Sequence, residues 1–138
     1  MDKNSIKLTV IPCNLIPIIW DKIEMHIDLA IAESYGDLEK TNLYDRLING
    51  QESALVAIEG KEIIATCLVT ISTLDTGRKV LYVPSLGGNR MDEWLDQGLQ
   101  FLRQMASDLG CDGIRACGRH GWAKVIPQAK VLHSIVEF

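Results

Sequence analysis

The sequence predicts a single domain of the α/β (α+β) class, with helices flanking a mixed central sheet. Three observations lead to this prediction. Residues 54–58 and 63–72 have the composition of the two strands of a hairpin, residues 91–109 have a long amphipathic pattern, and a short strand-like segment follows at 114–117. Strands interleaved with helices are typical of this class. A chain of 138 residues is long enough to bury its core as one domain, residues 1–138.

The first half of the chain begins with a strand and two helices. Residues 6–11 form an apolar run that Pro12 closes. A helix is predicted from Ile16 to Ile31, because apolar residues recur there at helical spacing, and Pro17 suits a first helical turn. A shorter helix is predicted over residues 38–48, where leucines recur at similar spacing before an Asn-Gly pair.

A hairpin and one further strand form the centre of the predicted sheet. Residues 54–58 and 63–72 are rich in apolar and β-branched residues, and Gly60 lies in the turn between them. The longer of these runs alternates with a period of two. A third strand is expected over residues 80–83, ending at Pro84.

The second half combines a long helix with short elements. Gly87 and Gly88 are interpreted as a break, after which the helix 91–109 begins. At 1.5 Å per residue this helix would be about 28 Å long, enough to cross a sheet. A strand at 114–117, a short helix within 121–129 and a closing strand at 131–138 complete the prediction.

Composition excludes several classes of protein. The net charge of −4 argues against a nucleic-acid-binding surface or an anionic membrane as partner. No apolar run approaches the ~20 residues of a membrane-spanning helix, and the N-terminus has no apolar core of a signal peptide. The 4 cysteines form no C-x-x-C pair, which favours a reducing cytoplasm over a disulfide framework.

The first candidate site is the glycine pair before the long helix. Gly87 and Gly88 leave backbone N–H groups free to approach an anion where a helix begins. The alternative is a tight turn of the kind that many strand-to-helix connections need without any ligand. The sequence leaves both interpretations open.

The second candidate site follows the strand at 114–117. Arg119 and His120 could lie at the mouth of a ligand cleft, because ligands of such sheets bind beyond the carboxyl ends of the strands. They could equally cap the strand as solvated residues. Trp122 is interpreted as packing more readily than as a stacking platform. Cys117 and His120 lack a second pair of ligands, so we expect no metal site.

Taken together, the order of the elements resembles that of the GNAT N-acetyltransferases over nearly the whole chain. More narrowly, the second half resembles small GNAT-like proteins of tailed bacteriophages, and this resemblance implies a phage or prophage origin. The residues that carry it are Gly87-Gly88, Trp94-Leu95, Ala106 with Gly110-Cys111, and Gly118-Arg119 with Gly121-Trp122.

The resemblance implies acetyl-CoA as a cofactor, held between the fourth and fifth strands. Family members bind its pyrophosphate on a glycine loop before the long helix. The corresponding residues here are Leu86, Gly87, Gly88, Asn89 and Arg90, although the arginine follows the glycines instead of preceding them.

The resemblance also suggests catalytic residues. The tyrosine that often acts as the family's general acid, after the fifth strand, is absent here. His120 could supply a proton instead, because an imidazole titrates near neutrality. Tyr82 occupies a position in the fourth strand from which many family members present a base or a group that shapes the substrate site.

Two functions therefore compete. The first is a GNAT-fold protein without turnover, acting in phage morphogenesis or host interaction, and the altered glycine loop and missing tyrosine favour it. The alternative is an acetyl-CoA-dependent N-acyltransferase that acts on an amine. The expected partner is accordingly a phage or host protein or a small-molecule acyl donor, with a homo-oligomer left open. Without a cofactor, the ligand or partner surface would be the strand end that carries Arg119 and Trp122. Its positive residues, Arg115, Arg119, His120 and Lys124, would contact an anionic group.

Overall fold

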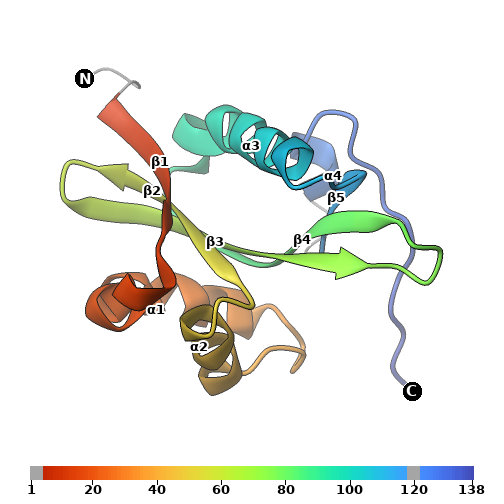
Figure 1. Ribbon diagram of the computed structural model, residues 1–138, viewed down its shortest axis with the longest axis horizontal. Coiled ribbons are helices and arrows are strands. Elements are labelled where there is room, and N and C mark those ends of the chain that lie inside the picture. The colour runs from red at the N-terminus through yellow and green to blue at the C-terminus, as the bar shows by residue number, and fades with distance from the viewer. Residues whose placement is uncertain (1–4, 118–121) are drawn as a thin grey trace.

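Five strands form one mixed sheet in the computed structural model, which describes residues 5–117 and 122–138. The strand order follows the chain order, and every neighbouring pair is antiparallel except β4 and β5, which are parallel. Figure 1 shows this sheet edge-on between layers of helices. The strands are β1 (Ile6–Ile11), β2 (Ser53–Glu59), β3 (Glu62–Thr73), β4 (Lys79–Gly88) and β5 (Gly113–Ala116).

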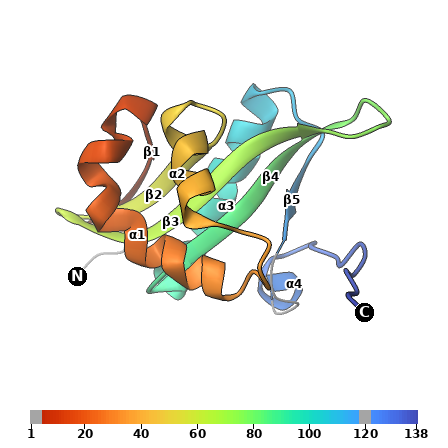
Figure 2. The same ribbon diagram turned by 90° about the horizontal axis from the view of Figure 1, so that it is seen from below.

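Helices cover both faces of the sheet. A short 3-10 turn, η2 (Cys13–Leu15), leads into α1 (Ile16–Ala32), and α1 and α2 (Lys40–Ile48) lie on one face. The helix α3 (Met91–Asp108) connects the parallel strands β4 and β5 across the other face, as Figure 1 and Figure 2 both show. A four-residue helix, α4 (Trp122–Val125), follows β5. No helix in the described ranges is long and apolar enough to cross a membrane.

The alternation of side chains along the strands builds two apolar cores. In β2, Ala54 and Val56 pack against α1 and α2, whereas Leu55 packs on the α3 side. Cys67 of β3 lies in the α3-side core, and burial raises the pKa of its thiol to about 12. Cys67 therefore fills a core position.

The contact between α1 and β4 is unusually close. A Cβ atom placed on Gly87 would lie 2.2 Å from the backbone oxygen of His26. The His26 side chain is itself buried, and its Nδ1 lies 2.9 Å from the Thr66 hydroxyl oxygen. Gly88 lies equally close to β3, because its Cβ would come within 2.5 Å of the Ala65 Cα and the Ile64 oxygen. Both glycines are thus required by backbone packing.

Most predicted elements are confirmed, and two predictions are wrong. The long helix and the strand over 63–72 form as expected. The strand predicted to end at Pro84 continues to Gly88, because residues 85–88 keep pairing with β3, so the glycines end a strand and do not interrupt it. The closing strand at 131–138 is absent, because the segment has no hydrogen-bonded neighbour in the sheet.

Replacing Gly87 by alanine is expected to destabilise the fold by about 2 kcal/mol, the usual cost of forcing atoms into a filled space. The helix α1 cannot move away without opening the core beneath it. Urea unfolding measures the effect. The matched control is Gly98→Ala in α3, where the nearest atom to a new Cβ is a Trp94 ring carbon at 3.5 Å. This control should gain up to about 1 kcal/mol from helix propensity. Equal stabilities of the two variants would contradict the close contact.

The buried His26 predicts a dependence of stability on pH. Burial lowers the pKa of His26 below its ordinary value of 6.5, so the folded protein resists a proton that the unfolded chain accepts. The free energy of unfolding should therefore fall as the pH drops below 6.5. Comparing urea unfolding at about pH 7.5 and about pH 5.5 tests this. The His26→Asn variant should lose less unfolding free energy on acidification than the unmodified protein. The control His133→Asn, at an exposed position, should lose as much as the unmodified protein.

Candidate functional site

The parallel strands β4 and β5 separate part-way along the sheet. They pair from Val80 with Gly113 to Val83 with Ala116, and β4 then continues to Gly88 without β5 beside it. Figure 2 shows the two strands diverging towards the lower edge of that view. We call this region, bounded by residues 84–88 of β4 and the end of β5, the splay. Along it β4 has a hydrogen-bonded neighbour on its β3 side only, among the described strands.

A β-bulge in β4 coincides with the start of the splay. Leu68 of β3 pairs with Ser85, but Thr70 pairs with Tyr82, so β4 advances by three residues while β3 advances by two. Pro84 lies inside this step and has no N–H to donate. Bulges redirect side chains, and this one leaves Tyr82 and Ser85 on the same face of the sheet, although they are an odd number of residues apart.

That face carries polar side chains beneath α1. Ser85 is 4% exposed, and its hydroxyl oxygen has no hydrogen-bond partner among the described residues. Tyr82 pairs with Arg115 of β5, and its hydroxyl interacts with Cys117, one residue beyond the end of that strand. The bulge therefore places a tyrosine hydroxyl, a thiol and a buried serine near the splay.

The environment of Tyr82 fixes its protonation state. Burial, together with the neighbouring groups Cys117, Asp37 and Glu52, raises the pKa of Tyr82 to about 12. At neutral pH the hydroxyl is therefore protonated. The hydroxyl can therefore donate a proton at neutral pH.

Carboxylates act on Tyr82 from the α1–α2 side. Asp37 lies in the connection between these helices, and Glu52, which is 5% exposed, precedes β2. The Glu52 carboxylate accepts a hydrogen bond of 2.7 Å from Arg46 Nε, so its charge is balanced locally. Asp37 is exposed.

The turn between β4 and α3 has most of its groups engaged. Leu86 packs against the apolar cores on the α3 side. The Asn89 N–H donates to the Ile64 oxygen at 2.8 Å, and the Asn89 oxygen accepts from Trp94 Nε1 at 2.7 Å. Since Gly87 and Gly88 are explained by packing, none of these four residues requires a ligand to account for it.

Arg90 is held by two carboxylates. It precedes α3 in the left-handed region, with φ of 58°. Its guanidinium donates two hydrogen bonds of 2.8 Å to the Glu59 carboxylate and further bonds to Glu93. The Arg90 partner lowers the pKa of Glu59 to about 2. The arginine thus ties the β2–β3 hairpin to the start of α3.

The structure brings the five predicted cofactor-binding residues, Leu86 to Arg90, together at one turn. The turn fits a pyrophosphate poorly, because its arginine and the Asn89 N–H already have partners and the carboxylates of Glu59 and Glu93 lie beside it. His120 and Arg119 lie outside the described residues, so their predicted roles stay predictions. Trp122 begins α4.

Sequence reasoning missed the residues around Tyr82. The proximity of Tyr82 to Cys117 and Asp37 arises from three separate elements, and nothing local to these residues indicates it. One signal was available. Pro84 inside a strand pattern indicates a bulge or an edge, and it would have located the start of the splay.

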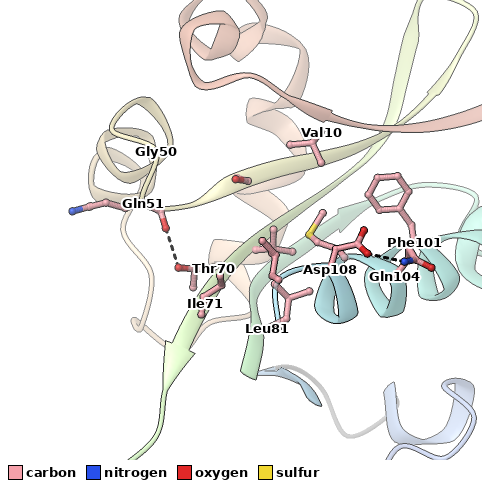
Figure 3. A pocket seen from close by; sticks show the side chains of 13 residues that line it. Val10, Gly50, Gln51, Thr70, Ile71, Leu81, Phe101, Gln104 and Asp108 are labelled. Atoms are coloured by element: carbon pink, nitrogen blue, oxygen red, sulfur yellow. Dashed lines mark hydrogen bonds between the residues drawn. The ribbon is translucent and has the colours of Figure 1, made fainter. Parts of the chain in front are cut away.

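A groove of about 680 Å³ lies elsewhere, on the α3 face of the sheet. Figure 3 shows Leu81 and Phe101 pointing into it, with Gln104 and Asp108 at its α3 side. Its lining is mainly apolar, and neither Tyr82 nor the Leu86–Arg90 turn contributes to it. No group of His, Cys, Asp and Glu among the described residues could hold a metal ion.

Comparison with known proteins supports the fold. No family model matches the sequence, and neither does any curated protein sequence. Solved structures do match. An aminoglycoside acetyltransferase, meta-AAC0020, from an uncultured soil metagenomic sample gives a TM-score of 0.68 at 13% identity, covering 98% of this chain and 95% of that one.

Two further acetyltransferase structures are similar. The ribosomal-protein-alanine N-acetyltransferase of Brucella melitensis biovar Abortus 2308 gives a TM-score of 0.68 at 9% identity, over 96% of this chain and 99% of its own. An acetyltransferase of Trypanosoma brucei gives 0.61 at 13% identity, over 96% and 99%. The chain has a GNAT-like α/β fold, as predicted. At such identities the likeness concerns the fold alone.

The Arg90 cluster predicts a measurable titration. Arg90→Ala should raise the pKa of Glu59 from about 2 towards its ordinary 4.5, because the guanidinium is the main cause of the shift. The stability that Glu59 contributes is present above pH 4.5 and is lost as the pH falls towards 2. NMR titration of the Glu59 carboxyl carbon measures this. Arg103→Ala, at an exposed position of α3, is the control and should leave Glu59 unchanged.

Proposed function

We propose that this chain transfers an acyl group from a pantetheine thioester to an amine, with acetyl-CoA as the first donor to test. The observation that carries the proposal is the splay itself, with the protonated Tyr82 hydroxyl on the adjoining face. The fold that it shares with acetyltransferases of known structure supports the same reaction class.

The donor would lie along the free edge of β4. No described strand pairs with residues 84–88 on the β5 side, so backbone groups on that edge can bind an extended ligand as a sheet edge binds a peptide. A pantetheine arm is such a ligand, because it is extended and contains two amide groups. The Asn89 N–H and the Arg90 guanidinium already bind protein groups. Donor binding would therefore depend on the pantetheine arm more than on the phosphates.

Tyr82 would act as a general acid. In direct transfer, the amine nitrogen attacks the thioester carbonyl, the C–N bond forms and the C–S bond breaks. The departing thiolate takes a proton from the Tyr82 hydroxyl, which solvent later restores, and the proton lost by the amine goes to solvent. The carboxylate of Asp37 would attract the cationic acceptor, which must lose its proton before it attacks.

A second function rests on the engaged turn. Arg90 and the Asn89 N–H already have protein partners, and the two glycines are explained by packing. These observations favour a GNAT-fold protein that binds a macromolecular partner without turnover. The role in phage morphogenesis or host interaction that the resemblance implies is a proposal of this second kind.

Calorimetry and a thiol-release assay distinguish the two functions. If the chain is an acyltransferase, acetyl-CoA should bind with a Kd in the micromolar to sub-millimolar range, about −8 to −5 kcal/mol. Tyr82→Phe should lower kcat by roughly a hundredfold, the usual contribution of a general acid, and leave the Kd unchanged. Tyr44→Phe is the matched control, because Tyr44 stacks edge-to-face on Trp20 away from the splay.

The acyltransferase proposal fails if millimolar acetyl-CoA gives neither binding heat nor a thermal shift. Substituting Gly87 or Gly88 would not test it, because both positions are needed for the fold. Loss of activity in Tyr82→Phe with an unchanged melting temperature separates a catalytic effect from a structural one.

A further inference from the structure

The groove on the α3 face of the sheet is built like a site for a small ligand. Its volume of about 680 Å³ lies within the range of small-molecule sites. The floor consists of Val69 of β3 and Leu81 of β4, which are 3% and 1% exposed. Phe101 and Met105 line it from the side of α3. None of the described residues that line the groove belongs to the splay.

Large apolar side chains at the rim of the groove remain open to water. Val10 of β1 is 36% exposed, Ile71 of β3 is 43% exposed, and Leu109, directly after α3, is 44% exposed. They continue the apolar surface of the floor outwards. Contact of such a surface with water is unfavourable, and a ligand with an apolar body would relieve it.

Asp108 supplies the charge of the groove. Among the described residues that line it, Asp108 is the only one with an ionisable side chain. Its carboxylate accepts a hydrogen bond of 2.8 Å from the Gln104 side chain, as Figure 3 shows. No cation in the described part of the chain forms an ion pair with it. Gln104 therefore orients the carboxylate and leaves its charge uncompensated.

The place of Asp108 in α3 adds to the negative potential. It is the last residue of the helix, where the helix dipole is negative, and the last turn has no basic residue. Lys79 of β4 donates to the Leu109 backbone oxygen at 3.0 Å and does not line the groove. An aspartate at this position is unfavourable for the helix alone, and a cation beside it would reverse that effect. This end of the groove therefore favours a cation over an anion.

We propose that the groove binds an amphipathic amine, a ligand with an extended apolar body and a primary ammonium group at one end. The ammonium would contact the Asp108 carboxylate, and the apolar body would lie along α3 towards Phe101. At a rise of 1.5 Å per residue these two positions are about 10 Å apart along the helix axis, which an alkyl chain of medium length spans. This proposal does not depend on the acyl-transfer proposal.

The polar groups of the groove favour an alkylamine over a peptide. The Thr70 hydroxyl donates to the Gln51 backbone oxygen at 2.9 Å, so these two lining groups already satisfy each other. A peptide would bring several backbone N–H and C=O groups that need partners, and a mainly apolar lining supplies few. An alkylamine brings a single polar group, for which Asp108 is the matching partner.

Three ligands with the same alkyl chain test the proposal by calorimetry. Octylamine, octan-1-ol and octanoate carry a positive, a neutral and a negative head group at neutral pH. We expect octylamine to bind most tightly and octanoate most weakly. Octylamine alone should bind more weakly as the salt concentration rises, because its contact with Asp108 is an exposed ion pair.

Variants separate the charge contact from the apolar contact. Asp108→Asn should lower the affinity for octylamine by about fivefold, the upper range for an exposed ion pair, and leave that for octanol unchanged. Asp96→Asn, at an exposed position of α3 outside the groove, is the matched control and should change neither. Ile71→Ala removes apolar contact at the rim and should weaken octylamine and octanol alike, by roughly threefold.

Methyl NMR locates the ligand. Octylamine should shift the Met105 methyl signal, and Tyr82→Phe, at the splay, should leave the affinity for octylamine unchanged. Unchanged melting temperatures show that the variants keep the fold. Four outcomes would each overturn the proposal: no binding heat for octylamine at millimolar concentration, octanol or octanoate binding as tightly as octylamine, no effect of Asp108→Asn, or octylamine affinity lost in Tyr82→Phe.

Discussion

The close approach of α1 to β4 is the constraint on which the rest of the fold depends. At Gly87 the strand leaves no room for a side chain, because the His26 backbone oxygen occupies that space. This contact fixes the height of α1 above the sheet and closes the core that α1 and α2 share with β2 and β3. The second half of β4, which diverges from β5, is paired with β3.

The same constraint changes the meaning of the glycine pair. Two glycines before a long helix suggest a phosphate site, and the sequence offers no means of distinguishing that from packing. The structure provides a packing reason for each of them and a protein partner for Arg90. The polar groups near the splay lie on the other side of the β4 bulge. There the Tyr82 hydroxyl interacts with Cys117, and the carboxylate of Asp37 contributes to the raised pKa of Tyr82.

Elements whose stability is encoded locally could be predicted from the sequence. The helix α3 and the strand β3 have strong periodicity, and both form within about two residues of their expected bounds. The end of β4 could not be predicted, because its last residues are ordered by hydrogen bonds to β3 across the sheet. The segment 131–138 has a strand-like composition, but a strand also needs a neighbour, and its own sheet supplies none. The surroundings of Tyr82 combine three distant segments, which no local pattern encodes.

Pro84 has a consequence for the state of the protein before any ligand arrives. Because this residue has no N–H, it cannot donate a backbone hydrogen bond to a neighbouring strand where the splay begins. The proline therefore disfavours a longer ladder at the place where the two strands diverge. A ligand that entered beside residues 84–88 would not have to break a hydrogen bond between the described parts of β4 and β5. Its affinity would then be reduced little by reorganisation of the protein, which is the advantage of a preorganised site.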